Sequence, residues 1–272
     1  MIRQDYEYRG LLAATWDLLR GDTSHWNDRF FYKEVIARYG QPVLDVGCGT
    51  GRLLLDYLGQ GIDIDGVDNS PEMLGICREK AERLGLSPQL YLQQMESLEV
   101  PRTFRTILVP SSSFQLLTDL DDARHAMRRF HALLQPGGVL AMPFMILWKD
   151  GDLLEHHDWK VMAEKVRPED GAVVRKRSRT SYDVANRLEH TDDIFEVILE
   201  GAIVAREHHR RSPGTRWYTQ DEAVSLYRQA GFGAIHAYAE FTFEPAPLGI
   251  PLFTIVGQKP SSHSLTGGGG TL

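Results

Sequence analysis

Short apolar runs alternate with amphipathic segments through the first half of the chain. The apolar runs at 42–46, 64–68, 90–94, 106–110 and 139–144 predict buried strands. The intervening segments 52–58, 71–84 and 121–134 predict helices, and a Gln-Pro-Gly-Gly turn at 135–138 precedes the fifth strand. Strands that alternate with helices at this spacing imply right-handed parallel crossovers. The expected fold class is therefore α/β, with a doubly wound, mostly parallel sheet.

The pattern changes over residues 146–218. Turn signals at 167–171 and 200–201 separate the segments 172–182, 193–199 and 202–207, which predict an antiparallel meander. The α/β pattern returns at Thr219, which forms a capping box with Glu222 at the start of a helix that ends near Gly231. Strands at 234–243 and 252–258 then bring the sheet to seven. The meander is thus an antiparallel insertion between the fifth strand and the last helix.

The two ends of the chain differ from this core of residues 41–145 and 219–260. Residues 1–40 are helical in pattern and rich in aromatic side chains, which pack onto the sheet in the simplest interpretation: Tyr6, Tyr8, Trp16, Trp26, Phe30, Phe31 and Tyr32. Residues 261–272 are first serine-rich and then glycine-rich, a composition typical of a disordered tail.

Composition narrows the class of protein. The chain has 272 residues, 42% hydrophobic and 25% charged, as in a globular domain with an insertion. A net charge of −7 argues against a nucleic-acid partner, which would need a basic surface. No apolar run approaches the ~18 residues of a membrane span, and the polar start lacks a signal-peptide core. Two cysteines make neither a disulfide framework nor a zinc site, so we expect no metal and a cytoplasmic location.

A glycine turn follows the first strand. Asp45 ends the apolar run, and Gly47, Gly49 and Gly51 follow at every second position. Glycine allows a tight turn against which a ligand can lie closely. The dinucleotide fingerprint of nicotinamide enzymes has a different spacing, G-x-G-x-x-G, so a nicotinamide-dependent oxidoreductase is the weaker alternative. Asp45 suits a cationic amino-acid group better than a pyrophosphate.

A second acid ends the second strand. Asp68 lies 21 positions after Gly47, near the offset at which such folds place a ribose-binding carboxylate. Its two oxygens can accept hydrogen bonds from both ribose hydroxyls. Ser70 as N-cap and Pro71 in the first turn then begin the next helix.

These two segments together resemble a known family. The D-x-G-x-G-x-G turn from Asp45 and the D-x-S-x-x-M-L run from Asp68 resemble the class I S-adenosylmethionine (SAM)-dependent methyltransferases. The resemblance implies SAM as cofactor, with the methionine part held by Asp45 and the turn. It also implies a set of cofactor-binding residues: Asp45, Gly47, Cys48, Gly49, Gly51, Arg52, Asp68, Asn69, Met73, Met95, Glu96, Ser111, Phe114 and Trp16.

Within this set the resemblance implies separate roles. Met73, Met95 and Glu96 would surround the adenine. Ser111 and Phe114 would face the sulfonium and the acceptor. Arg52 would pair with the methionine carboxylate or be a solvated first-turn arginine, and Tyr6, Trp16 or Trp26 would form an N-terminal helical lid with cation–π attraction for the sulfonium.

The resemblance further implies methyl transfer by in-line displacement to a nitrogen or oxygen of a small-molecule acceptor. Alignment and exclusion of water supply much of the acceleration, while a hydroxyl acceptor also needs a base. Tyr182 and His190, on the insertion, lead the candidate bases. The insertion is expected to cover the acceptor and to mediate a homodimer. Its acids are candidates for holding a cationic amine or form a solvated face: Glu189, Asp192, Asp193 and Glu196. A SAM-binding protein without transfer activity is the remaining alternative.

Overall fold

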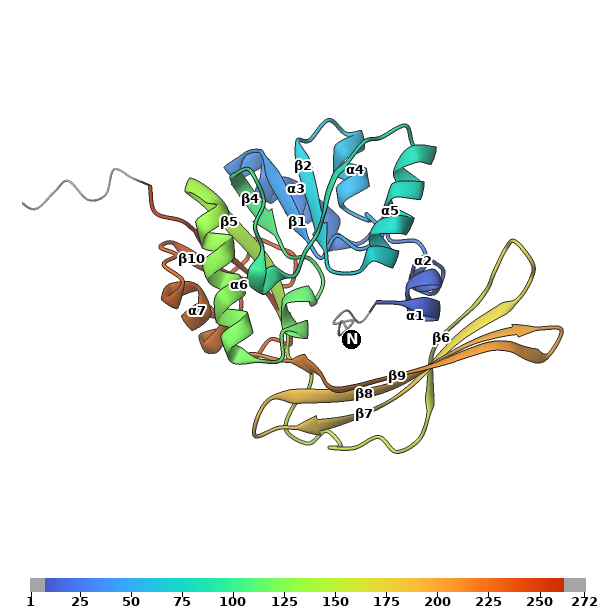
Figure 1. Cartoon of the computed structure of the whole chain (residues 1–272). Coiled ribbons are helices and arrows are strands. Elements are labelled where there is room, and N and C mark those ends of the chain that lie inside the picture. Colours follow the sequence, from blue (N-terminus) through green and yellow to red (C-terminus); the bar gives the residue numbers. More distant parts are fainter. Residues whose placement is uncertain (1–7, 262–272) are drawn as a thin grey trace, which may run out of the picture.

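The computed structural model describes residues 8–261, which contain two separate sheets (Figure 1). The strands of the larger sheet are β1 (Val43–Val46), β2 (Ile64–Asp68), β3 (Gln89–Leu92), β4 (Phe104–Leu108), β5 (Leu134–Met145), β10 (Ile235–Ala239) and β11 (Leu252–Gln258). Their order is β10-β11-β5-β4-β1-β2-β3, and only β11 runs antiparallel to its neighbours. The predicted doubly wound, seven-stranded, mostly parallel sheet is confirmed.

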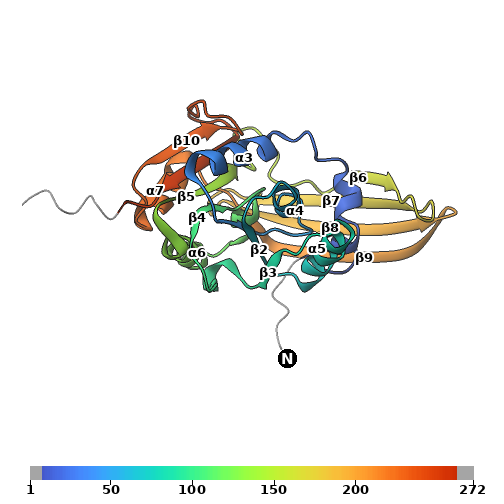
Figure 2. The same ribbon diagram turned by 90° about the horizontal axis from the view of Figure 1, so that it is seen from above.

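Helices cover both faces of this sheet, as Figure 2 shows for α3 and α6. The helices α3 (Asn27–Tyr39), α4 (Leu54–Gly59) and α5 (Pro71–Arg83) cover one face, and α6 (Leu120–Leu133) and α7 (Gln220–Gln229) cover the other. Along β1, Val43 packs in the hydrophobic cluster under α3, α4 and α5, and Leu44 packs in the cluster under α6 and α7. Burial on both faces explains why the strands are continuous apolar runs in the sequence.

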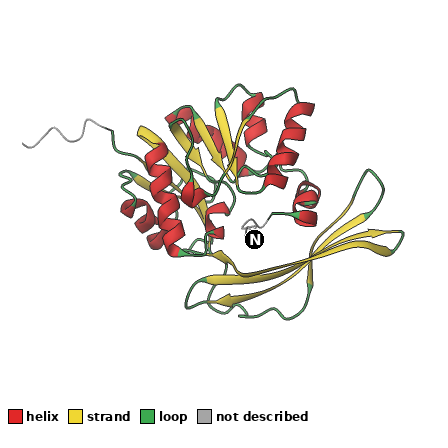
Figure 3. Ribbon diagram, in the orientation of Figure 1, coloured by secondary structure: helices red, strands yellow, loops and turns green. Residues whose placement is uncertain are grey.

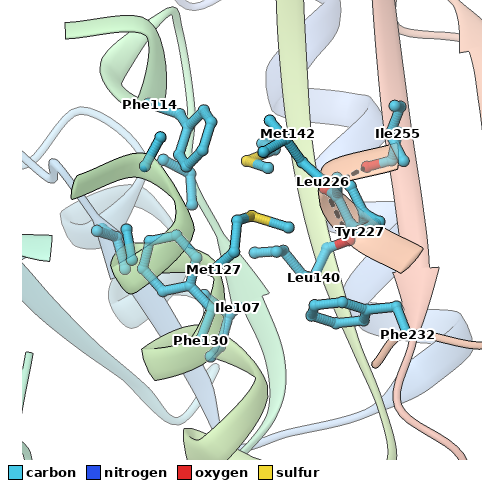
Figure 4. Close-up of a cluster of buried hydrophobic side chains, with 14 of the residues drawn as sticks. Ile107, Phe114, Met127, Phe130, Leu140, Met142, Leu226, Tyr227, Phe232 and Ile255 are labelled. Carbon is cyan, nitrogen blue, oxygen red and sulfur yellow. Dashed lines mark hydrogen bonds between the residues drawn. The ribbon is translucent and has the colours of Figure 1, made fainter. Parts of the chain in front are cut away.

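The core beneath α6 and α7 is closely packed (Figure 4). Met127 and Phe130 of α6 and Leu226 and Tyr227 of α7 lie against the sheet. The buried Tyr227 hydroxyl donates to the carbonyl oxygen of Ile255 at 3.2 Å, so its polar end is satisfied inside an apolar layer.

Several predicted ends of helices and strands are confirmed, and others lie at different residues. The Ser70 hydroxyl accepts from the amide of Met73, and the capping box of Thr219 and Glu222 is present. The helix after the glycine turn begins at Leu54, later than predicted, because residues 50–53 continue the turn. The fifth strand is assigned from Leu134, earlier than predicted, but residues 135–138 are not in register with β4 or β11 and Gly137 has a φ of +76°. The register with β4 jumps here, from Leu134 opposite Phe104 to Val139 opposite Thr106, so residues 135–138 form an irregularity before the regular strand.

The predicted antiparallel insertion is also confirmed (Figure 3). Its strands are β6 (Lys160–Val166), β7 (Val173–Asp183), β8 (Leu188–Leu199) and β9 (Ala202–Arg216). The pattern of the sequence did not indicate β6, whose side chains are almost all exposed. It also made β8 and β9 too short.

The insertion lies across the carboxyl ends of the parallel strands, with α1 (Gly10–Ala14) and α2 (Trp16–Arg20) beside it (Figure 1). Leu11, Leu18 and Leu19 of these helices pack on Val174 and Val197. Tyr6 and the predicted tail beyond Ser261 lie outside the described residues. Within 8–261, no helix is long and apolar enough to cross a membrane.

Candidate functional site

A cavity of about 1000 Å³ lies at the carboxyl ends of β1, β2 and β4. Its walls are the glycine turn, the end of β2, the 3-10 helix η1 (Met95–Ser97), the loop after β4 and the segment from Tyr8 to Asp28. Ligands of open α/β sheets bind at this position, outside the strand ends. Most of the predicted cofactor-binding residues line it: Trp16, Asp45, Gly47, Cys48, Gly49, Arg52, Asp68, Asn69, Met73, Met95, Glu96 and Ser111.

The glycine turn is held by backbone hydrogen bonds to β2. The amides of Gly47 and Cys48 both donate to the carbonyl oxygen of Val67, at 2.8 and 3.0 Å. Gly49 has a φ of +55°, and a Cβ there would meet no described atom within 4 Å. This residue therefore leaves open space on the cavity wall.

Gly51 has a different role from the one predicted, because it does not line the cavity. A Cβ at Gly51 would lie 2.7 Å from the sulfur of Cys77 and 2.8 Å from Leu55. It is a packing glycine that lets α4 approach α5.

Asp45 is a buried acid with an unsatisfied oxygen. The amide of Leu54 hydrogen-bonds the carboxylate, but Oδ1 has no hydrogen-bond partner among the described residues. Burial raises the pKa of Asp45 to about 7, and Arg52 acts in the opposite direction. Asp45 lines the cavity, and a buried carboxylate oxygen without a partner calls for a donor or a cation from a ligand.

Asp68 is fixed by backbone amides. Its Oδ1 accepts from Ser70 at 2.9 Å and its Oδ2 from Gly49 at 2.8 Å. Burial raises the pKa of Asp68, although these amides oppose the shift. Each oxygen keeps a second lone pair, so the carboxylate can accept further donors from the cavity.

Arg52 has a partner that the sequence did not indicate. Both of its terminal nitrogens donate to the carboxylate of Asp28, one at 3.0 Å and the other in a shorter contact. The side chains are 14% and 5% exposed, so Arg52 is not a solvated arginine. Asp28 lies on α3, and no local signal connects it to the glycine turn.

Arginine side chains already lie on the predicted aromatic lid. The guanidinium of Arg20 lies 5.1 Å from the ring centre of Trp16 and 4.8 Å from that of Trp26. Its Nη2 donates to the hydroxyl of Ser111 at 3.0 Å. Burial, and then Arg52, lower the pKa of Arg20. The rings were predicted to attract a ligand cation, but the cations beside them belong to the protein.

Phe114 lies outside the cavity lining. Its ring is buried against Phe144 and Tyr218, with centroids 6.0 Å apart in both pairs. The structure thus gives it core packing in place of the predicted contact with sulfonium and acceptor. A single aromatic residue after three serines fits either a core position or a contact with a ligand, so the sequence could not separate the two roles.

The two predicted bases also lie elsewhere. Nδ1 of His190 is 2.8 Å from the Ser212 hydroxyl, and Tyr182 packs on Trp217 at 6.1 Å between ring centroids. Burial raises the pKa of the Tyr182 phenol. No described residue of 146–218 lines the cavity, so neither side chain reaches it in this structure.

The acids of the insertion are largely occupied by neighbouring cations. Asp192 pairs with Arg179, His208 and Arg210, Asp193 with Lys176 and Arg211, and Glu196 with Arg177 and Arg206. The interpretation of these three as holders of a cationic amine is therefore wrong. Among residues 8–261, no three His, Cys, Asp or Glu side chains gather as a metal site.

Comparison with known proteins relates this chain to methyltransferases. A family model described as "Methyltransferase domain" matches residues 43–138. A putative methyltransferase of Geobacillus sp. (strain WCH70) is 30% identical over 243 residues, which cover 85% of this chain and 92% of the relative.

Solved structures share the fold. An S-adenosylmethionine-dependent methyltransferase from Clostridium acetobutylicum has a TM-score of 0.73 at 19% identity, covering 91% of this chain and 97% of its own. The sugar N-methyltransferase KedS8 from Streptoalloteichus sp. has a TM-score of 0.67 at 20% identity, with coverages of 89% and 90%. With the glycine turn and the two strand-end acids at one cavity, the chain belongs to the class I S-adenosylmethionine-dependent methyltransferases.

Proposed function

We propose that the enzyme methylates a nitrogen or oxygen atom of a small-molecule acceptor, with Asp45 as the anchor of the cofactor. The observation that carries the proposal is the unsatisfied Oδ1 of Asp45, buried beside the glycine turn at the cavity wall. The amino-acid end of SAM carries an ammonium group, which supplies both a donor and a positive charge. The residues present therefore fit the cofactor that the family uses.

Other residues of the cavity would bind the ribose and the adenine of the cofactor. Asp68 would accept hydrogen bonds from the ribose hydroxyls, and Met73, Met95 and Glu96, which line the same cavity, would enclose the adenine. When bound, the cofactor supplies an electrophilic methyl group on a positively charged sulfur. The protein contributes orientation and exclusion of water. A cavity of about 1000 Å³ is large for a single small ligand, which leaves room for an acceptor.

Among the two acceptor atoms, the lining of the cavity favours nitrogen. The described lining contains one histidine, His25, and its side chain is 73% exposed. A hydroxyl acceptor usually needs a well-placed base, whereas an amine needs only to arrive unprotonated. The near-absence of histidine from the described lining supports an amine acceptor over a hydroxyl that would need histidine as its base.

A panel of matched amines and alcohols tests the proposal. We expect SAM-dependent gain of one methyl mass on amines and release of S-adenosylhomocysteine (SAH), with little transfer to the matched alcohols. Replacing His25 by Ala should change turnover of the best amine by less than about tenfold, since loss of a general base typically costs about 10²-fold or more. A loss of about 10²-fold or more would show that His25 acts as a base on the amine, and exclusive transfer to alcohols would favour O-methylation.

Removing the carboxylate of Asp68 tests the ribose role. Asp68→Ala should weaken SAH binding by about 1–3 kcal/mol, because the hydroxyls lose a charged acceptor. Calorimetry measures the affinity, and a thermal melt reports the separate loss of the hydrogen bonds to Gly49 and Ser70. Asp65→Ala on the same strand is the matched control, since Asp65 pairs with Arg102 and does not line the cavity. An unchanged affinity in Asp68→Ala would remove this residue from the site.

A further inference from the structure

Where the cavity reaches β5 and β11, its wall is apolar. This wall is built from the ends of the two strands, the second half of the loop after β4 and the loop that follows β10. Met145 and Leu252 lie opposite each other in the β5–β11 pair, and both are half-buried. The side chains of this apolar wall are Leu116, Leu117, Pro143, Met145, Phe241 and Leu252.

The two strand-end residues leave apolar surface without an apolar partner from the core. Phe144 and Phe253, their neighbours in the chain, stack at 5.5 Å between ring centroids in the core under α6 and α7. Successive side chains of a strand point to opposite faces, so Met145 and Leu252 are turned away from that core. Neither belongs to a hydrophobic cluster among the described residues. Both line the cavity, so a ligand there would contact them.

Charged side chains of the cavity belong to other elements. No charged residue of the described lining comes from β5, β11 or the loops after β4 and β10. Asp122 is on α6, which packs against η1 beyond the other end of the cavity floor. Arg20 contacts the loop after β4 at Ser111, where the loop begins. The apolar wall therefore offers a ligand hydrophobic contact and no ion pair.

The cofactor of the proposed function lies on the other side of β4. Its anchors are Asp45 on β1 and Asp68 on β2, and the residues for the adenine include those of η1, after β3. In the sheet order, β5 is two strands from β1 in the opposite direction and β11 is three. With neighbouring strands about 4.8 Å apart, Met145 lies about 10 Å and Leu252 about 14 Å across the sheet from β1. The apolar wall is thus left for the second ligand.

We propose that the apolar wall binds a hydrophobic ring or alkyl group of the methyl acceptor, so that the enzyme selects hydrophobic amines over polyhydroxylated ones. Burial of an apolar group against these side chains is favourable, whereas hydroxyl groups placed there would lose hydrogen bonds to water without replacement. The inference rests on the proposed function and adds the chemical class of the acceptor.

Two neutral compounds with the same ring test the wall without knowledge of the acceptor. Cyclohexanol and inositol, which carry one and six hydroxyls on a six-carbon ring, are titrated into SAH-saturated protein, with ligand-observed NMR and calorimetry as readouts. We expect cyclohexanol to bind at least tenfold more tightly than inositol. In turnover, kcat/KM for cyclohexylamine should exceed that for glucosamine at least tenfold when both are compared as the unprotonated amine.

Substitutions on the wall connect this preference to its residues. Met145→Gln keeps the length of the side chain but places an amide on the wall, so it should weaken cyclohexanol binding by about tenfold and leave SAH affinity unchanged. Leu116→Asn makes the same change on a separate element and serves if Met145→Gln does not fold. Leu199→Asn is the matched control, because Leu199 is an apolar strand-end residue, 37% exposed, outside the cavity lining. It should change neither affinity.

The outcomes separate the inference from the function on which it rests. Tighter binding of inositol than of cyclohexanol, or a cyclohexanol affinity that both wall variants leave unchanged, would overturn the inference. Turnover of glucosamine in preference to cyclohexylamine would do the same while leaving N-methylation in place. Failure of the wild type to bind SAH would instead contradict the proposed function.

Discussion

Replacing Asp45 by asparagine is expected to weaken SAH binding by about 10²-fold or more while stabilising the free protein above pH 7. The asparagine side chain keeps an oxygen for the amide of Leu54 but loses the negative charge at the cavity wall. Breaking one side of a buried charge pair typically costs about 3–5 kcal/mol, which is enough for a loss of this size. Calorimetry with SAH measures the affinity.

The stability change has the opposite sign because the free protein buries an unpaired acid. The pKa of Asp45 is raised from 3.8 to about 7, mainly by burial. The folded state therefore holds a proton that the unfolded state releases between about pH 4 and pH 7. Stability from this group is present below about pH 4 and is lost as the pH rises through 7, by up to about 4 kcal/mol. Melts of Asp45→Asn and wild type should converge at low pH and separate at pH 8.

The same titration predicts how affinity depends on pH. SAH needs the charged form of Asp45, so wild-type affinity should fall by about tenfold between pH 8 and pH 6. The weak binding of Asp45→Asn should lack this dependence. Equal affinities of the wild type at pH 6 and pH 8 would show that Asp45 does not hold the ammonium.

The sequence predicted the parts of the site that are local in the chain. Asp45, Gly47 and Asp68 belong to strand–turn–helix units whose geometry depends on neighbouring residues, and all three line the cavity. Arg20 and Asp28 were missed because their partners, Ser111 and Arg52, are distant in sequence. Only the folded chain brings the N-terminal helices against the strand ends.

The insertion shows the same limit. Its antiparallel character followed from turn signals and β-forming segments, but its contacts did not. Leu11 and Leu18 of the N-terminal helices pack on Val174 and Val197 of the insertion, which are distant from them in the chain. The N-terminal helices therefore lie beside the insertion and line the cavity with Trp16 and Arg20, whereas the bases predicted on the insertion do not line it. Phe114 packs in the core.

Gly49 and Gly51 of the turn, which look equivalent in the sequence, should respond differently to the same substitution. Gly49→Ala should weaken SAH binding by about 10-fold or more, because the added methyl group fills open space on the cavity wall. Its stability should fall by only about 1–2 kcal/mol, the cost of a left-handed φ in alanine. Gly51→Ala should instead lose more stability, since its methyl group would clash with Cys77 and Leu55 in addition to the strain.

Thermal melts and SAH calorimetry on both variants separate these effects. Gly85→Ala is the matched control for backbone strain alone: Gly85 has a φ of +66°, open space around its Cβ position and no place in the cavity lining. We expect Gly49→Ala and Gly85→Ala to melt alike but only the former to lose affinity. Gly51→Ala should melt well below both and, while folded, bind SAH within a few-fold of the wild type. The reverse pattern, with binding lost at Gly51 and retained at Gly49, would place the cofactor on the other side of the turn.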